Sequence, residues 1–231
     1  MKLNMTAIAL LALVLLGGCS KTVEWNHIQK RGEIFYLVND PNPYSGKAIL
    51  WYENGQKHEN GQKRLETDFV DGLRHGKQID WYENGQKQQE DDYVTGLQNG
   101  KSISWSENGH KQQEVDYVDS LLNGKSISWY ENGKKKTEVD YVDSLLNGKA
   151  ILWYENGQKQ QEVDYVDGKE QGLKTTWYWN GKKETEVDFA IGLRHGKSIS
   201  WSENGHKQQE VNYKYGKQIL MLRQNPVLIL R

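Results

Sequence analysis

The chain repeats itself every 24 residues, and this repetition limits its fold more than any other feature. Six tryptophans, from Trp81 to Trp201, stand 24 residues apart, and Trp51 precedes the first of them by 30 residues. The six extra residues, 58–63, nearly copy residues 52–57. A period this short and regular is typical of stacked supersecondary units, so we expect an elongated array and not a globule.

Each unit is predicted to be a β-hairpin. In the unit 124–147, the segments 125–130 and 138–141 alternate polar and apolar residues, as half-buried strands do. Asn132-Gly133 stands between the two segments and is a strong hairpin signal. The sequence therefore predicts an all-β chain, folded as one elongated, twisted antiparallel sheet of about seven consecutive hairpins.

The length of the hairpin loop decides which side chains share a face. A two-residue Asn-Gly loop would pair Ile127 with Glu138 and divide the apolar residues between the two faces. A three-residue loop, 131–133, pairs Ile127 with Thr137 and puts the apolar residues of the unit on one face: Ile127, Trp129, Val139 and Tyr141. We expect burial to select the three-residue loop, with a type I turn and Gly133 in a left-handed bulge position.

Three sets of residues follow from this register. The predicted core of the repeats is formed by Trp51, Trp81, Trp105, Trp129, Trp153, Trp177 and Trp201. The predicted turn glycines are Gly55, Gly85, Gly109, Gly133, Gly157, Gly181 and Gly205. The tyrosines that follow the tryptophans face the other way and are either candidate binding residues or cross-strand packing residues: Tyr52, Tyr82, Tyr130, Tyr154 and Tyr178.

An apolar face of this length would exceed what monomers usually expose. Twisting of the sheet, a second copy of the chain as a homodimer, or a partner protein would have to cover it. Residues 217–231 begin another unit but lose its tryptophan and its turn. We expect them to form a terminal cap, which repeat arrays require.

The first residues have the anatomy of a bacterial leader. Lys2 precedes ten apolar residues, a run too short to span a bilayer, and Leu16-Gly17-Gly18-Cys19 resembles a lipobox. The resemblance implies a signal peptide over 1–18 and lipidation of Cys19, the single cysteine of the chain. The residue after this cysteine is Ser20, and in this it resembles lipoproteins that are sorted to the outer membrane. We therefore expect a lipid-anchored protein of the cell envelope with a tether and first strand over 19–45 and repeats over 46–216.

The repeats themselves resemble the MORN-type repeat, in particular its bacterial variant. Tyr52-Glu53-Asn54-Gly55 with Glu66 and Phe69, and Tyr154-Glu155-Asn156-Gly157 with Glu162 and Tyr165, carry the resemblance. Residues 31–36 and 43–46 are also similar to the start of a MORN-like family described as antitoxins. The resemblance implies a fold and says little of function, because one fold supports many functions.

Composition excludes several classes of protein. A formal net charge of −1 provides no electrostatic footprint for nucleic acid. One cysteine excludes a disulfide framework, and the six histidines share no spacing on a strand face, so no metal and no cofactor is expected. The Gly100-Lys101-Ser102 triplet lacks the spacing and the following helix of a phosphate-binding loop. Catalysis needs one asymmetric site, whereas the repeats offer near-equivalent ones, so we expect no enzyme.

The leading hypothesis is a lipid-anchored repeat protein that binds another protein, for instance as an antitoxin or immunity-like protein that neutralises a toxin. An envelope protein that binds glycan or peptidoglycan is the alternative, because aromatic-Asn-Gly repeats loosely resemble cell-wall-binding repeats. An envelope enzyme with its site in 26–45 is a third, weaker hypothesis.

Overall fold

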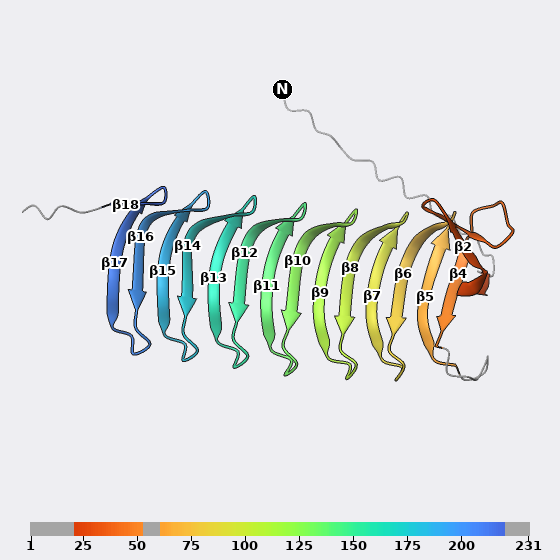
Figure 1. Ribbon diagram of the computed structural model, residues 1–231, viewed down its shortest axis with the longest axis horizontal. Coiled ribbons are helices and arrows are strands. Elements are labelled where there is room, and N and C mark those ends of the chain that lie inside the picture. Colours follow the sequence, from red (N-terminus) through yellow and green to blue (C-terminus); the bar gives the residue numbers. More distant parts are fainter. Residues whose placement is uncertain (1–20, 53–60, 220–231) are drawn as a thin grey trace, which may run out of the picture.

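The protein forms one long open sheet. The computed structural model describes residues 21–52 and 61–219. Sixteen strands follow one another across this sheet in chain order, apart from two strands near the start that form a separate hairpin (Figure 1). The described residues contain no α-helix, and none of their helical segments is long and apolar enough to cross a membrane. The predicted all-β array of consecutive hairpins is confirmed.

The strands of the repeats are β4 (Gly46–Trp51), β5 (Lys63–Val70), β6 (Leu73–Trp81), β7 (Lys87–Val94), β8 (Leu97–Trp105), β9 (Lys111–Val118), β10 (Leu121–Trp129), β11 (Lys135–Val142), β12 (Leu145–Trp153), β13 (Lys159–Val166), β14 (Lys169–Trp177), β15 (Lys183–Ala190), β16 (Leu193–Trp201) and β17 (Lys207–Lys214). The short β18 (Lys217–Ile219) pairs with β17 at the last described edge. All these neighbours are antiparallel.

Two kinds of turn alternate along the array. At the Asn-Gly turns, the Gly133 N–H donates to Tyr130 O at 2.9 Å, the Tyr130 N–H donates to Lys134 O, and Gly133 has a φ of +79°. This is the geometry of a three-residue loop with a left-handed glycine. At the opposite edge, two residues with positive φ, such as Asp143 and Ser144, join consecutive hairpins in the manner of type I′ turns.

The predicted register is wrong beyond the first pair of the hairpin. Trp129 pairs with Lys135 as expected, but the next pair is Ser128 with Thr137, which leaves Lys136 as an extra residue in a β-bulge. Ile127 therefore pairs with Glu138, not with Thr137. The same shift recurs after the turn of every described hairpin, so one residue moves all later side chains to the other face.

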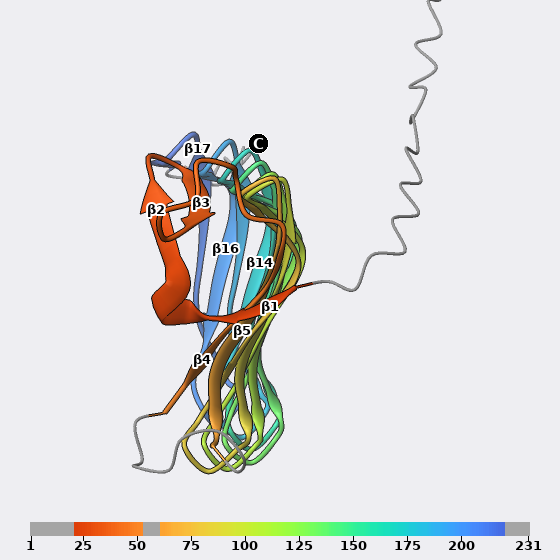
Figure 2. The ribbon, with the colours of Figure 1, turned by 90° about the vertical axis from the view of Figure 1, so that its right-hand side faces the viewer.

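The bulge gives the sheet two mixed faces in place of one apolar face. The convex face carries the tryptophans, isoleucines and Lys–Glu pairs; in one hairpin these are Lys101, Ile103, Trp105 and Glu114. The concave face carries the valines, tyrosines, serines and glutamines; there they are Ser102, Ser104, Gln113, Val115 and Tyr117. The sheet is bowed when viewed along its length (Figure 2). The prediction that Ile127, Trp129, Val139 and Tyr141 share a face is thus wrong, and no wholly apolar face needs cover.

Residues 21–45 close the start of the array. They form β1 (Thr22–Glu24), the short 3₁₀ helix η1 (Trp25–His27), β2 (Ile28–Arg31) and β3 (Ile34–Leu37). β1 pairs with β4 in parallel, while β2 and β3 form a hairpin on the concave side (Figure 2). The Phe35 ring lies 4.8 Å from the ring of Phe69, which belongs to the tyrosine row of the concave face. This segment makes the main buried cluster with Tyr44 and Ala48.

Close backbone contacts hold this cap. The Phe35 N–H donates to Gly72 O at 2.8 Å, and the Gly72 N–H donates to Tyr44 O at 2.7 Å. A Cβ on Gly72 would come within 2.7 Å of Phe35 O, so a side chain would displace the cap. The Tyr44 hydroxyl lies 2.7 Å from Lys21 O, and burial, aided by the Asp68 carboxylate, raises the pKa of Tyr44 to about 12.

Ile191 should be a point of strain. It has a φ of +54° in a type I′ turn and is 64% exposed, whereas Asp71, Asp119, Asp143 and Asp167 occupy its position in other units. A β-branched residue is disfavoured in this region, while aspartate tolerates it. We expect Ile191→Asp to raise the free energy of unfolding by about 1 kcal/mol in urea titrations. The reciprocal Asp167→Ile should lower it by a similar amount; equal stabilities would contradict the assignment of strain.

Candidate interaction surface

The concave face is hollowed at the centre of the array. A hollow of about 360 Å³ opens over β7 to β11. Its lining contains no charged side chain and is rich in hydroxyl and amide groups: Gln89, Gln98, Ser102, Ser104, Gln113, Val115, Tyr117, Leu122, Ser126 and Tyr141. A concave surface with apolar patches and convergent polar groups is what a binding site requires.

A row of aromatic side chains runs along this face. Tyr117, Tyr141 and Tyr165 follow one another at intervals of 24 residues, each beside a valine on the same strand. Val115 and Val163 are buried, so these valines pack beneath the exposed side chains of this face. Within residues 21–52 and 61–219, the hydroxyls of these three tyrosines form no hydrogen bond with another protein group. Tyrosines with free hydroxyls on a rigid support are suited to recognition.

One unit of the concave face departs from the repeat. Asp91 occupies the position of Val115 and is only 2% exposed. It accepts hydrogen bonds from the side-chain amides of Gln89 at 2.9 Å and Gln98 at 3.2 Å. Burial raises the pKa of the neighbouring Asp80, and the Asp91 carboxylate adds to this effect. The charges of Arg74 and Arg64 oppose it, so the start of the concave face carries carboxylates together with arginines.

The convex face is held by a ladder of ion pairs. Glu114 accepts hydrogen bonds from Lys101 at 2.6 Å and from Lys111 at 2.7 Å. Lys101 also contacts Asp116 at 3.0 Å, and the Lys111 ammonium lies 5.3 Å from the ring of Trp129 in the next hairpin. The same arrangement recurs around Glu138 and Glu162. The ladder therefore links each hairpin to its successor through a cation–π contact.

These lysines shift the titration of the glutamates. Hydrogen bonds from Lys101 and then Lys111 lower the pKa of Glu114 below its usual value. Lys135 and Lys125 do the same for Glu138, and Lys159 and Lys149 for Glu162. A lowered pKa means that the charged carboxylate is favoured in the folded state.

The predicted tryptophan core is not a buried core. All seven tryptophans of that set are half-buried, and the buried side chains of the repeats are mainly on the concave face, such as Val115, Ala150, Val163 and Val187. The indoles do share one side of the sheet, where lysines of the preceding hairpin cover those of Trp81, Trp105, Trp129, Trp153 and Trp177. The register shift separates them from the valines, which removes the expected apolar packing.

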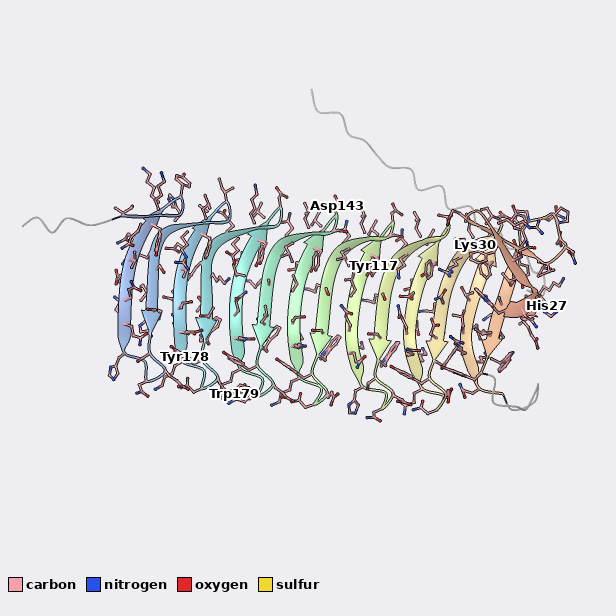
Figure 3. All side chains as sticks on the ribbon, in the orientation of Figure 1. His27, Lys30, Tyr117, Asp143, Tyr178 and Trp179 are labelled. Carbon is pink, nitrogen blue, oxygen red and sulfur yellow. The ribbon has the colours of Figure 1, made fainter. Side chains whose placement is uncertain are left out.

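The five candidate tyrosines join neighbouring repeats. Tyr52, Tyr82, Tyr130, Tyr154 and Tyr178 each donate a hydrogen bond to the backbone carbonyl of the next repeat's tryptophan, at 2.6–2.9 Å. Asn132 adds a parallel link, since its amide donates to Glu155 O at 3.0 Å. Figure 3 places Tyr178 and Trp179 at the Asn-Gly turns, at the edge opposite Asp143. These contacts favour the packing interpretation, because the hydroxyls are already engaged.

The remaining predicted residues divide between described and undescribed parts. Gly85, Gly109, Gly133, Gly157, Gly181 and Gly205 all have a φ between +78° and +90° at their turns. Cys19, Gly55 and residues 220–231 lie outside the described residues, so lipidation and most of the terminal cap stay predictions. No group of three or more histidine, cysteine, aspartate or glutamate side chains suited to a metal occurs in the part of the chain that the structure describes.

Sequence reasoning missed Tyr117, Tyr141 and Tyr165 as surface residues, because the assumed register buried them with the tryptophans. A signal was present in the chain. The bulge position is polar in every hairpin: Arg64, Gln88, Gln112, Lys136, Gln160, Glu184 and Gln208. A polar residue at the same place in each unit is compatible with an unpaired bulge that points to solvent.

Fold and surface together define a class of structure: an open β-hairpin array that residues 21–45 cap at one end, with a concave face that is hollowed over β7 to β11. Five segments match the sequence profile of the MORN repeat variant: 74–94, 98–119, 122–143, 146–167 and 194–215. Repeats of this family are non-enzymatic modules that commonly mediate interactions with proteins or membranes. No curated protein matches the chain in sequence.

The tyrosine links should stabilise the array. Tyr130→Phe removes the hydroxyl that lies 2.7 Å from Trp153 O, and we expect it to lower the free energy of unfolding by about 1 kcal/mol. Tyr141→Phe is the matched control, because its hydroxyl has no protein partner in the described residues; its effect should stay within about 0.5 kcal/mol. Urea denaturation measures both, and equal losses would contradict the role of the link.

The Lys–Glu ladder should make stability depend on pH. Because its folded pKa is lowered, Glu114 contributes stability above its unfolded pKa and loses it as the pH falls through the folded pKa. Glu114→Gln should therefore be destabilising at pH 7, by at most about 1 kcal/mol in these exposed networks, and neutral near pH 2. Thermal unfolding across this range tests it, with Glu131→Gln in a turn as control. If the stability difference between Glu114→Gln and the unchanged protein persists at pH 2 or grows in 1 M NaCl, its origin is not electrostatic.

Proposed function

We propose that the protein is a lipid-anchored envelope protein whose concave face binds a segment of another protein. The observation that carries this proposal is the row of Tyr117, Tyr141 and Tyr165 beside a hollow lined by serines and glutamines. Their hydroxyls have no protein partner in the described ranges, and their valine neighbours hold them on a rigid sheet. Aromatic and amide side chains in this arrangement supply contact area at low entropic cost.

The chain itself provides a precedent for a polypeptide on this face. Its own residues 21–45 lie over the first hairpin and place the Phe35 and Trp25 rings 4.8 and 6.2 Å from the Phe69 ring. Phe69 precedes Tyr93 and Tyr117 in the same 24-residue series. A polypeptide with an aromatic anchor therefore fits this face where it is covered. The units that no described segment covers present related residues to a second polypeptide.

The proposed location in the cell envelope rests on the leader-like segment that ends at Cys19 and not on the sheet. The lipobox-like segment that ends at Cys19 stands two residues before the first described residue, Lys21, which is fixed against Lys47 by a backbone hydrogen bond of 3.0 Å. An acylated Cys19 would thus keep the array close to the outer membrane. An antitoxin or immunity-like role is the specific form of this proposal in which the partner is a toxin.

A glycan is the second candidate for the same face. The hydroxyl and amide groups of Ser102, Ser104 and Gln113 next to the Tyr117 ring are compatible with a sugar as well as with a peptide. Purified peptidoglycan distinguishes the two candidates. If it sediments the protein, and Tyr117→Ala with Tyr141→Ala abolishes this, the glycan proposal replaces the protein proposal.

Photo-crosslinking in cells tests the protein proposal. A benzoylphenylalanine at position 141 lies on the concave face, while the same group at position 129 lies on the convex face of the same hairpin. We expect position 141 to yield one discrete adduct with a protein, position 129 to yield none, and Cys19→Ser to release the protein from the membrane fraction. The proposal is wrong if only position 129 crosslinks, if position 141 captures only peptidoglycan, or if the adduct is only a homodimer.

A further inference from the structure

The concave face has a second, cationic hollow near the end of the array. It measures about 290 Å³ and lies over β14 to β17. Its lining includes Lys174 and Arg194, together with the hydroxyls of Thr185, Ser198 and Ser200. The central hollow at β7 to β11 has no charged residue in its lining. The two positive charges thus distinguish this place from the equivalent surface of the middle repeats.

The repeat shows that neither cation is needed for the fold. Lys174 pairs with Val187 on β15, and the equivalent residue in the hairpin of β10 is Ser126, which pairs with Val139. Arg194 pairs with Phe189, and the equivalent residue opposite Tyr93 is Gln98. The repeat accepts uncharged residues at both positions. A charged residue at a position where other units carry a neutral one indicates a local function.

The charges of this hollow are only partly neutralised. Glu170 forms an ion pair with Lys174 at 2.8 Å. In the described residues Arg194 forms no ion pair; it is exposed, lies 5.4 Å from the Tyr213 ring, and reaches only the Tyr213 hydroxyl at 3.4 Å. Two cations and one carboxylate leave one positive charge facing the hollow. A guanidinium with free donors matches a carboxylate in a bidentate manner.

A second copy of the same motif provides an internal comparison. Leu-Arg-His-Gly occurs at 73–76 and again at 193–196. Arg74 is half-buried between the Phe35 and Tyr93 rings, and its charge acts on the half-buried Asp80. Within the residues that the structure describes, Arg194 has no such cap, and Ser200 and Val211 stand at the positions of Asp80 and Asp91. The same arginine is thus occupied in one unit and available in the other.

We infer that the hollow around Lys174 and Arg194 binds an acidic segment of the partner polypeptide. This inference rests on the proposed function and adds a direction to it. At the start of the concave face, the charge of Arg74 already acts on the Asp80 carboxylate, and Asp91 adds a second carboxylate. At the end of the face, Glu170 pairs with Lys174 and leaves Arg194 without an ion-pair partner in the described residues. An acidic segment is attracted more strongly at the end than at the start, so charge sets its position along the tyrosine row.

A peptide titration of the full chain in non-ionic detergent tests the inference. The probe is acetyl-Glu-Glu-Glu-Glu-amide, and amide chemical shifts in NMR spectra report where and how tightly it binds. We expect shifts around β14 to β17 and a Kd of about 0.1–1 mM at low salt, weakening several-fold at 0.3 M NaCl. The uncharged acetyl-Gln-Gln-Gln-Gln-amide should not bind.

Variants drawn from the repeat itself provide the controls. Arg194→Gln and Lys174→Ser introduce the residues found at positions 98 and 126, so the fold should tolerate them, which circular dichroism checks. We expect Arg194→Gln to weaken binding at least 10-fold and Lys174→Ser about 3-fold, while Arg74→Gln changes it less than 2-fold. Equal weakening by Arg74→Gln, no weakening by Arg194→Gln, or equally tight binding of inorganic phosphate would overturn the inference.

Failure of this inference is distinguishable from failure of the proposed function. If position 141 crosslinks a protein but Arg194→Gln does not weaken binding of the peptide, only the proposed site for an acidic segment is wrong. If the peptide binds at Arg194 but position 141 captures no protein, the proposed function is wrong and an anion site remains.

Discussion

One extra residue per hairpin determines what each face of this sheet can do. Beyond the Asn-Gly turn, a β-bulge at positions such as Lys136 shifts the pairing by one, so Ile127 lies opposite Glu138 and Val139 lies opposite Ser126. Because side chains alternate along a strand, this shift sends the valines and tyrosines to the concave face and leaves the tryptophans with the lysines and glutamates. A single sheet with one wholly apolar face would need a second layer. Two mixed faces make a one-layer array compatible with water.

Contacts between neighbouring units, and not a buried core, then stabilise the array. Within each unit little is fully buried, and the links run from one repeat to the next: a tyrosine hydroxyl to a tryptophan carbonyl, an asparagine amide to the next turn, and a lysine over the next indole. Each contact is weak by itself but recurs with the repeat. Stability in such arrays is roughly a sum over neighbours, so the terminal units need separate protection. Residues 21–45 supply it at the start of the array.

The periodicity predicted the parts of the structure that depend on local sequence. The hairpins, the three-residue loops, the left-handed glycines and the alignment of the indoles all follow from Asn-Gly pairs and the constant 24-residue spacing. The periodicity did not predict which side chains lie on which face of the sheet. The predicted register assumed that burial of Ile127 with Val139 outweighs the ion pairs of Glu138. The ladder of Lys125, Lys135 and Glu138, together with the bulge, shows the opposite balance. The cap over Phe69 involves contacts distant in sequence, which no periodic signal reveals.

Function in a repeat array depends on departures from the repeat. Residues common to all units are constrained by the neighbours on either side, as the tyrosine links show, and they cannot mark one place along the sheet. Asp91, Lys174 and Arg194 each replace a neutral residue of the concave face, and none of them is required by the strand pairing. They place a carboxylate near the start of an otherwise similar surface and two cations near its end. A uniform row of tyrosines would let a polypeptide slide from unit to unit, whereas opposite charges at the two ends fix both its register and its direction.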